Sequence, residues 1–468
     1  MKTLFILLLI GIQLPVLGQN LHQLSLEEFL GLVKTHHPLL KQANLALSDA
    51  QAKLLKARGA FDPKIELDNN KKEFKGTTYF NQLNAAFKIP SWYGIEFKAA
   101  VEDNYGNYLN PQYYTADQKL YQVGAEVSLA KGLLINERMA TLKQAKLYKQ
   151  QAKAENQLAV NELLYEATNA YFNWLKSYKE QLIFSEFTLN AKNRLNSIEK
   201  SVTLGERPPI DITESKIAYN SRKLSQEKAR LNYIKAGLAL SNYLWIDEIP
   251  VELKKEMIPD INTLNKVESV LAIDGFSLAS LALESHPKLR SLTYKKEALQ
   301  VEKRLQLNNL LPTINVQYNF LNQSSDIINN LNPTNYKAGL TFQMPLFLRK
   351  ERANLQLATI KLQSVEWDQL QTKLSLKNKI SAIVTEIESY SNQLLINKEI
   401  VSDYQKLLSG EERKFELGES ALFYIITRES KLIESRLKEI DAEYTLLVSK
   451  SKLFNVISTT TPEWNENS

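Results

Sequence analysis

The sequence predicts a mainly helical, internally duplicated protein that also contributes strands to a membrane β-barrel. Three observations predict this fold class. A His-Pro pair followed by a helical and then an alternating segment occurs twice, 249 residues apart. Each copy leads into more than sixty residues without glycine or proline, which predicts very long helices. The segments before these helices alternate between apolar and polar residues, as membrane strands do.

The N-terminus predicts export from the cytoplasm. Lys2 precedes an apolar run over Leu4–Leu17, and the small Gly18 suits a cleavage site. We expect a signal peptide over 1–18, cleaved near Gly18–Gln19. A retained membrane anchor is the alternative, but the run is short for a span of about 20 residues. No later segment has 18 consecutive apolar residues, so the sequence predicts no spanning helix.

Composition limits the available chemistry. The chain has no cysteine, which excludes disulfides, zinc–thiolate sites and a lipid anchor on cysteine. A net charge of +6 over 468 residues does not suggest nucleic-acid binding. Adjacent His36 and His37 do not converge on a metal from one helix, and no P-loop or dinucleotide motif occurs. We predict no enzyme activity, no metal and no cofactor, and we expect the pair Glu411-Glu412 to be solvated.

The two repeats begin alike. His-Pro pairs at Pro38 (THHPLL) and Pro287 (ESHPKL) are each followed 25 residues later by another proline, Pro63 or Pro312. The intervals favour helix, and alternating apolar residues follow them. Because proline disfavours helical geometry in the residue before it, each His-Pro pair should separate a short helix from the next helix. The histidines themselves are predicted to be incidental.

The two β segments differ in length. Four alternating runs occupy the first, at Ile65–Phe74, Leu83–Ile89, Ile95–Val101 and Val123–Leu129, and two occupy the second. The first contains twelve aromatic residues in 67 positions, twice the 9% of the whole chain. This excess favours the aromatic girdles of a transmembrane barrel over an aromatic-rich globular sheet. A barrel in lipid has no open edge and needs about eight strands, so several chains must contribute to it.

Each long helix ends at a glycine. Apolar residues three and four apart, such as Leu163, Ala167 and Ala170, place one apolar seam on the helix. Leu-Gly-Glu then occurs in both copies, and Gly205 and Gly418 suit the left-handed conformation that ends a helix. A second helix runs back through about Trp245 in the first copy and about Ser458 in the second. Each copy therefore ends in a long helical hairpin.

This arrangement resembles the TolC-type outer-membrane efflux proteins, the outer-membrane components of tripartite efflux and type I secretion systems. The resemblance covers nearly all of the mature chain. It rests on LSLEEFLGLVKTHHPLL, on the strand entries at Pro63 and Pro312, on MPLF at Met344–Phe347 and on the two Leu-Gly-Glu turns. It implies a homotrimer whose strands form one outer-membrane β-barrel and whose helices form a periplasmic α-barrel, or tunnel. The implied partners are a periplasmic adaptor (membrane fusion) protein, an inner-membrane efflux transporter and outer-membrane lipid.

The resemblance divides the chain into nine segments. They are the signal peptide (1–18), the first belt helix and tunnel helix (19–63), the first β-barrel segment (64–130), the first long hairpin with its tip near 205–210 (131–245), the connector or equatorial belt (246–275), the second tunnel helix (276–311), the second β-barrel segment (312–345), the second long hairpin with its tip near 418–423 (346–458) and the C-terminal tail (459–468). The middle hairpin of the first β segment, near 83–101, either adds strands to the barrel or folds outside it.

The resemblance also implies that the two helical turns form a periplasmic tip for adaptor docking and gating. The residues assigned to this role are Gly205, Glu206, Arg207, Asp211, Gly418, Glu419, Ser420, Tyr424 and Arg428. Asp211, six residues after Gly205, matches an acidic position that narrows the tunnel entrance in the family. Tyr424, six residues after Gly418, does not match it, and Thr427 stands where another acid is often found.

The function predicted from these features is passive export of small molecules or secreted substrates through a duct. A polar tunnel lining lets hydrated solutes pass, and an inner-membrane pump supplies the energy. The alternative is a periplasmic coiled-coil adaptor or scaffold without a membrane barrel. Such a protein would carry one β-rich module after its helical hairpin, whereas this chain has two β segments, each between helices. The sequence does not predict the cargo.

Overall fold

The computed structural model describes residues 22–115, 119–254, 256–275, 283–326 and 329–458. The predicted signal peptide (1–18) and C-terminal tail (459–468) lie outside these residues, as does the segment 276–282 expected to form a short helix before His286. The chain divides into two compact units. The hairpin unit comprises Met1–Leu40, Val160–Ser280 and Lys379–Ser468, and the sheet unit comprises Lys41–Ala159 and Leu281–Asn378.

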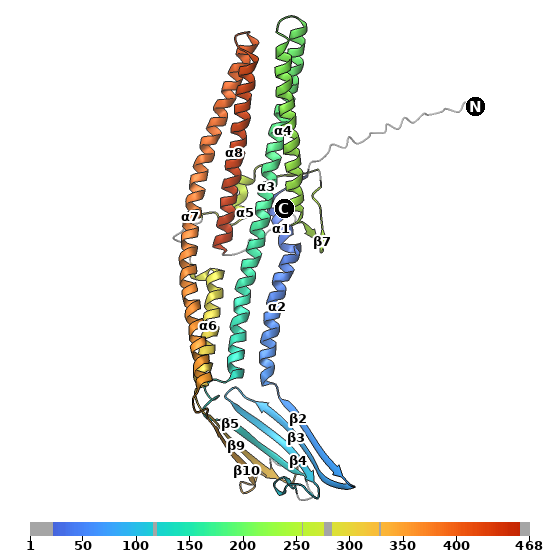
Figure 1. Ribbon diagram of the computed structural model, residues 1–468, viewed down its shortest axis with the longest axis vertical. Coiled ribbons are helices and arrows are strands. Elements are labelled where there is room, and N and C mark those ends of the chain that lie inside the picture. Colours follow the sequence, from blue (N-terminus) through green and yellow to red (C-terminus); the bar gives the residue numbers. More distant parts are fainter. Residues whose placement is uncertain (1–21, 116–118, 255, 276–282, 327–328, 459–468) are drawn as a thin grey trace, which may run out of the picture. The chain divides into compact units, whose positions relative to one another are not determined.

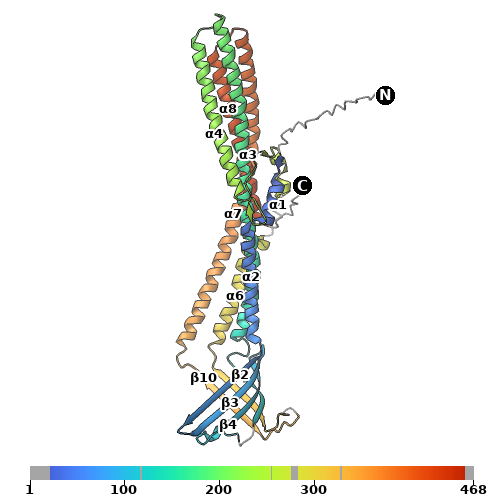
Figure 2. The same cartoon turned by 90° about the vertical axis from the view of Figure 1, so that its right-hand side faces the viewer.

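Two helical hairpins lie side by side in the hairpin unit (Figures 1 and 2). Helix α3 (Glu137–Thr203) turns into α4 (Ile210–Ser241), and α7 (Arg349–Glu416) turns into α8 (Leu422–Ile457). Both turns lie at the same end of this unit. Helix α4 stops at Ser241, short of the predicted Trp245, which instead begins the short strand β6 (Trp245–Ile246).

Both hairpin turns have the backbone geometry that the sequence predicts. Gly205 and Gly418 have φ values of 76° and 79°. The N–H of Gly205 donates to the Val202 carbonyl at 3.0 Å, and the N–H of Glu206 donates to Ser201 at 2.9 Å. The corresponding bonds at Gly418 and Glu419 measure 3.1 and 2.8 Å. This pair of bonds is the Schellman motif, in which a left-handed glycine satisfies the last carbonyls of a helix.

An apolar cluster joins the two hairpins. It contains Ile183 and Phe187 of α3, Leu408 of α7, and Ile425, Leu432, Ile433 and Ile440 of α8. Other apolar side chains of the helices stay exposed, among them Ile217, Leu224 and Leu231 of α4. Within the part of the chain that the structure describes, no helix combines the length and the apolar character needed to cross a membrane.

Short elements complete the hairpin unit. Strand β1 (His22–Leu24) pairs in parallel with β8 (Met257–Pro259), and β6 pairs with β7 (Ile249–Pro250). Helix α1 (Leu26–His36) begins where the Ser25 hydroxyl accepts a hydrogen bond from the Glu28 N–H at 3.1 Å. Helix α5 (Thr263–Val270) packs against α1 and α8. These elements occupy the region that the resemblance assigns to a belt.

A six-stranded antiparallel sheet lies at one end of the helices of the sheet unit (Figures 1 and 2). These helices are α2 (Pro38–Arg58), α6 (Pro287–Asn308) and the first parts of α3 and α7. The strands are β2 (Lys64–Phe74), β3 (Thr77–Pro90), β4 (Ile95–Tyr105), β5 (Leu120–Ser128), β9 (Thr313–Asn322) and β10 (Tyr336–Gln343). Their order is β10-β9-β5-β4-β3-β2. Strands from both repeats therefore share one sheet, and the middle hairpin of the first β segment is part of it.

The histidines of the two His-Pro pairs are helix caps, so the prediction that they are incidental was wrong. Nδ1 of His37 accepts a hydrogen bond from the Leu39 N–H at 3.2 Å, and Nδ1 of His286 accepts one from the Lys288 N–H at 3.1 Å. Both side chains are buried. Because proline has no N–H, the residue after it carries the first helical N–H that needs an acceptor. The same cap therefore starts both α2 and α6.

Replacing His37 by alanine should destabilise the protein by about 1–2 kcal/mol, because the Leu39 N–H loses its cap. Burial lowers the pKa of His37, although a hydrogen bond with the Asn242 backbone opposes this. The neutral ring is the form that accepts the bond, so its contribution is present above about pH 6.5 and is lost as the pH falls below that value. Thermal unfolding followed by circular dichroism at pH 7.5 and 5.5 measures both effects. His37→Asn, which keeps a capping acceptor, should recover much of the stability without this pH dependence; equal pH dependence in both proteins would contradict the assignment.

Candidate functional site

The sheet has one apolar and one polar face. Neighbouring strands place alternate residues opposite one another, so each face is read from the pairing register. One row across all six strands consists of Ile65, Phe87, Ala99, Val123, Phe320 and Tyr336. Parallel rows on the same face add Leu67, Leu83, Ala85, Ile89, Ile95, Phe97, Val101, Tyr121, Ala125, Val127, Ile314, Val316, Tyr318, Ala338, Leu340 and Phe342. The apolar face thus extends without a break from one edge of the sheet to the other.

Many of these apolar side chains are exposed. Ile65 is 81% exposed, Leu340 72% and Phe342 65%, and aromatic residues such as Phe97 are also exposed. A water-soluble protein rarely exposes an apolar surface of this extent. Strands that are apolar on one face and polar on the other are typical of transmembrane barrels.

The opposite face is polar and charged. The row next to the apolar row above consists of Lys64, Lys88, Lys98, Gly124, Asn319 and Lys337. Acidic residues on adjacent rows balance these lysines: Lys88 lies 2.6 Å from Glu66, and Lys337 lies 3.6 Å from Glu102. Such a face is suited to contact water and hydrated solutes.

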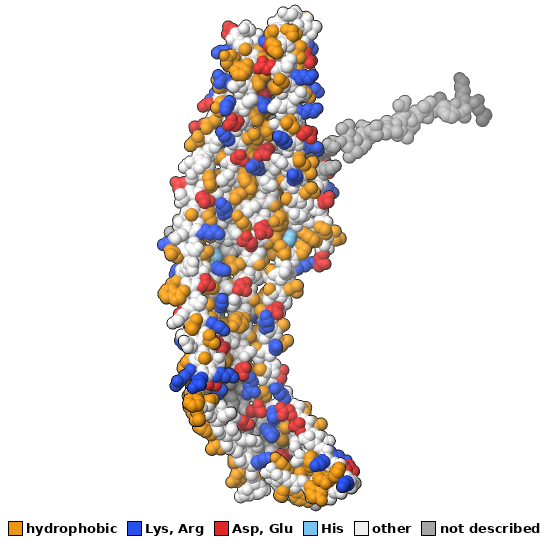
Figure 3. Space-filling view, in the orientation of Figure 1, with side chains coloured by type: hydrophobic (Ala, Val, Ile, Leu, Met, Phe, Trp, Pro, Cys, Tyr) orange, Lys and Arg blue, Asp and Glu red, His pale blue; other side chains and the backbone are white. Residues whose placement is uncertain are grey.

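Exposed apolar side chains lie next to basic side chains where β10 leads into α7. Leu346 is 91% exposed and Phe347 71%. Arg349, Lys350 and Arg352 follow at the start of α7, and the Arg349 guanidinium lies 5.2 Å from the centre of the Phe347 ring. In Figure 3 hydrophobic and basic side chains gather next to each other at this place. Apolar groups beside cations fit the boundary between lipid chains and phosphate headgroups.

Two predicted tip residues of the first hairpin pair with each other, and one of them also contacts the second hairpin. The Arg207 guanidinium stacks 3.8 Å from the centre of the Phe415 ring of α7 and lies 3.7 Å from the Asp211 carboxylate. Asp211 is therefore paired and mostly buried. Gly205 and Gly418 face open space, and Glu206 and Glu419 lie in the turns.

Ser420 and Arg428 both approach Glu411. The Ser420 hydroxyl donates to Glu411, and Arg428 Nε lies 3.9 Å from it. The Glu411 side chain is 13% exposed, so the expectation that this carboxylate is solvated was wrong. The turn after α7 brings Ser420 and the first part of α8 back beside Glu411, which shields this carboxylate from water. Tyr424 stays half exposed and packs against Phe423.

A buried charge cluster near the tip was not predicted from the sequence. Glu429 of α8 is 1% exposed. Its carboxylate lies 2.6 Å from Arg194 of α3 and 3.3 Å from Arg222 of α4. Arg194 also lies 3.6 Å from Glu412 of α7, and burial raises the pKa of Glu412. One cluster therefore links all four helices of the two hairpins.

A sequence signal for this cluster exists. Leu422, Ile425, Glu429 and Leu432 are spaced by three, four and three residues, so Glu429 occupies an apolar position of the helix seam. A charged residue at such a position must be paired when it is buried. Its arginine partners lie more than 200 residues away, and no local pattern identifies them.

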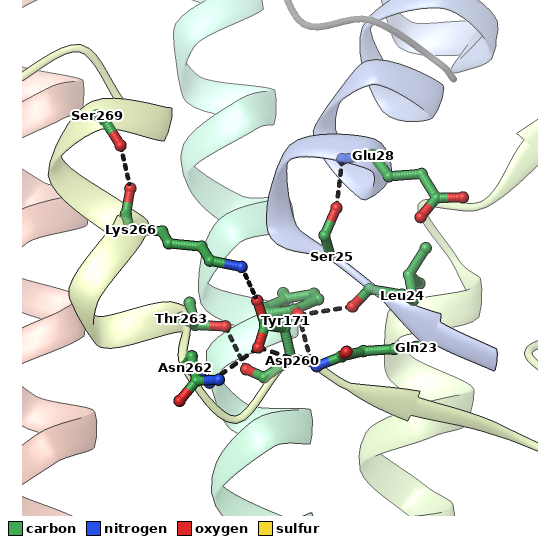
Figure 4. A network of polar contacts seen from close by, with 10 residues as sticks. All are labelled: Gln23, Leu24, Ser25, Glu28, Tyr171, Asp260, Asn262, Thr263, Lys266 and Ser269. Carbon is green, nitrogen blue, oxygen red and sulfur yellow. Dashed lines mark hydrogen bonds and ion pairs between the residues drawn. The ribbon is translucent and has the colours of Figure 1, made fainter. Parts of the chain in front are cut away.

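A second polar network anchors β1 and the segment between β8 and α5 to α3 (Figure 4). The Tyr171 hydroxyl donates to the Leu24 carbonyl at 2.8 Å and accepts from the Asp260 N–H at 3.0 Å. The Asp260 carboxylate accepts hydrogen bonds from Gln23 and Lys266, each at 2.9 Å. Burial by itself would raise the pKa of Asp260, but these hydrogen bonds hold it below its ordinary value. Burial also raises the pKa of Tyr171, so its hydroxyl stays protonated and able to donate.

Replacing Tyr171 by phenylalanine should destabilise the hairpin unit by about 1–3 kcal/mol, because the Leu24 carbonyl and the Asp260 N–H lose a buried partner. Thermal unfolding and the rate of proteolysis near β1 measure the loss. Tyr424→Phe is the matched control, because Tyr424 is 51% exposed at the tip. Equal stability of the two variants would show that this network does not hold β1 and β8 against α3.

Comparison with known proteins supports the family resemblance. Residues 278–458 match the family model described as outer membrane efflux protein. The resemblance seen in the sequence is confirmed. The description of the family names the outer membrane, which is the location that the sequence predicts. No curated protein matches the chain.

Solved outer membrane channels share the fold of the whole chain. The Campylobacter jejuni CmeC outer membrane channel is similar with a TM-score of 0.63 at 14% identity, over 94% of this chain and 87% of CmeC. The outer membrane protein VceC of Vibrio cholerae gives 0.64 at 13% identity, over 92% and 96%. The open state of the Neisseria gonorrhoeae MtrE outer membrane channel gives 0.64 at 13% identity, over 93% and 91%. The mainly helical fold with a six-stranded sheet is thus shared with these outer membrane proteins.

Proposed function

We propose that the protein is a passive export duct that crosses the outer membrane and extends into the periplasm as a homotrimer. The observation that carries the proposal is the two-faced sheet. Its apolar face fits lipid, and its polar face fits a water-filled lumen. In lipid every backbone polar group needs a partner, so an open six-stranded sheet must be completed by further copies.

The helical hairpins form the periplasmic part of the proposed duct. An apolar cluster packs the two hairpins of one copy together. Export through the duct requires no catalysis by this chain. Among the described residues, no group of three or more His, Asp or Glu side chains is arranged to hold a metal ion. An inner-membrane efflux transporter supplies the energy, and a periplasmic adaptor joins it to the duct.

The tip of the hairpins is the proposed docking and gating site. It contains the predicted residues Gly205, Glu206, Arg207, Asp211, Gly418, Glu419, Ser420, Tyr424 and Arg428. Apolar side chains beside them are exposed: Leu204 is 73% exposed and Leu417 67%. Exposed apolar side chains on two adjacent turns suit contact with a partner protein.

The double substitution Leu204→Asp and Leu417→Asp tests the docking proposal. It should abolish crosslinking to the adaptor and stop export, because the two aspartates would place unpaired charges in the contact with the adaptor. The double substitution to isoleucine should retain both activities. Crosslinking of the adaptor to this protein in the membrane fraction measures the first effect, and export of a fluorescent pump substrate measures the second. Normal export by the aspartate variant would contradict docking at this tip.

A further inference from the structure

We propose that the two edge strands of the sheet, β2 and β10, pair with each other between neighbouring copies, so that six strands from each of three copies close a barrel of eighteen strands. The proposal rests on the trimeric duct above and goes beyond it. It assigns a second copy of this chain to each edge, and it places the β2–β3 hairpin in the wall of the barrel.

Both edges are open in one copy. Within the described part of the chain, β2 pairs with β3 alone and β10 with β9 alone. Every residue of the two strands is exposed. All five pairings across the sheet are antiparallel, so β10 runs opposite to β2. Two such edges can pair in the same antiparallel manner when three copies are arranged around an axis.

The faces of the two edges also match. Lys64 begins β2 just after its helix, and Gln343 ends β10 just before the next helix. Placing these two residues opposite each other brings Leu67 opposite Leu340, so apolar side chains meet apolar side chains. The eight residues of β10 then pair with residues 64–71. This is the regular part of β2, because its register with β3 shifts only between Lys72 and Glu73.

The register within the sheet gives a barrel of ordinary tilt. The row that starts at Lys64 of β2 reaches Lys337 on β10, six residues before Gln343. Closure at Gln343 therefore shifts the register by six residues for each copy of six strands. A barrel whose total shift equals its strand number has a strand tilt of about 36°. Membrane barrels have tilts of about 35–45°.

The strand number fixes the kind of lumen. Barrels of about 16–18 strands leave an aqueous channel, whereas barrels of about eight strands are filled by side chains. The polar face with its rows of lysines and glutamates would line this channel. The outer-membrane part of the duct would then admit bulky hydrated solutes, and any selection would occur elsewhere along the duct.

Disulfide crosslinking tests the pairing directly. The chain has no cysteine, so every crosslink reports only introduced residues. Leu67→Cys with Leu340→Cys should give covalent trimers in the outer-membrane fraction, because paired Cα atoms lie about 4.5–5.5 Å apart. Leu67→Cys with Thr341→Cys is the matched control and should give none, since Thr341 points to the other face. Trimers from Ala99→Cys with Leu340→Cys instead would overturn the proposal, because β4 would then be the edge.

Spin labels on β3 test, without relying on a disulfide, whether the β2–β3 hairpin lies in the wall of the barrel. Ala85 and Ala86 are adjacent alanines on opposite faces of this strand. A label on Ala85→Cys should collide with oxygen dissolved in lipid, and one on Ala86→Cys with a water-soluble nickel chelate. Equal chelate access at both positions would place the hairpin outside the membrane and overturn the eighteen-strand barrel. If the protein were still recovered as an outer-membrane trimer, only this proposal would fail. Recovery of the protein in the soluble fraction would instead contradict the proposed function.

Discussion

Replacing Glu429 by alanine should destabilise the protein by about 3–5 kcal/mol, because two buried guanidinium groups lose their carboxylate partner. Arg194 and Arg222 would then lie unpaired between the hairpins. Since Glu429 links α8 to both α3 and α4, the tip should also loosen. Thermal unfolding of the detergent-extracted protein measures the first effect. Entry of a large hydrophilic dye into cells that produce the variant measures the second, and it should increase.

Glu434→Ala is the matched control for this change. Glu434 lies on the same helix, and hydrogen-bonded ion pairs with Lys438 and Lys431 lower its pKa to about 2. It is exposed, so water screens these pairs and their loss should change stability little. An alanine variant of Glu429 that is as stable and as impermeable as the Glu434 variant would contradict the role of the buried cluster.

Arginine at Ala99 should block assembly in the membrane, whereas arginine at Ala100 should be tolerated. Ala99 lies opposite Phe87 and Val123 on the apolar face, and Ala100 lies opposite Gln122 on the polar face. An arginine at the lipid midplane costs about 2–4 kcal/mol in each copy, while lumen substitutions cost little. The amount of trimer recovered from the outer membrane measures the difference. Equal recovery of the two variants would show that the apolar face does not meet lipid.

The local part of the fold could be predicted from the sequence. The turn at Gly205 is determined by a few neighbouring residues, because only a left-handed residue closes the helix in this way. The four strands of the first β segment follow from alternation, and the structure has them at β2 to β5. The duplication is visible in the equal spacing of the prolines that follow Pro38 and Pro287, and together with the Leu-Gly-Glu turns it indicates the family.

Tertiary contacts could not be predicted in the same way. The cap role of His37 depends on a ring that turns back to the Leu39 N–H, and histidine is not among the preferred capping residues. The partners of Glu429 come from helices far away in the sequence, and a surface charge and a buried one look alike in a charged helix. The pairing of β5 with β9 joins the two repeats, and alternation alone does not specify which strands are neighbours.

Fractionation of cells that produce the full chain tests directly whether the protein is an outer-membrane duct. The protein should be recovered in the outer-membrane fraction, and detergent should be needed to extract it. The extracted protein should have the mass of a trimer of 53.5-kDa chains less their signal peptides. Recovery in the soluble periplasmic fraction would contradict the outer-membrane duct and would favour the coiled-coil adaptor.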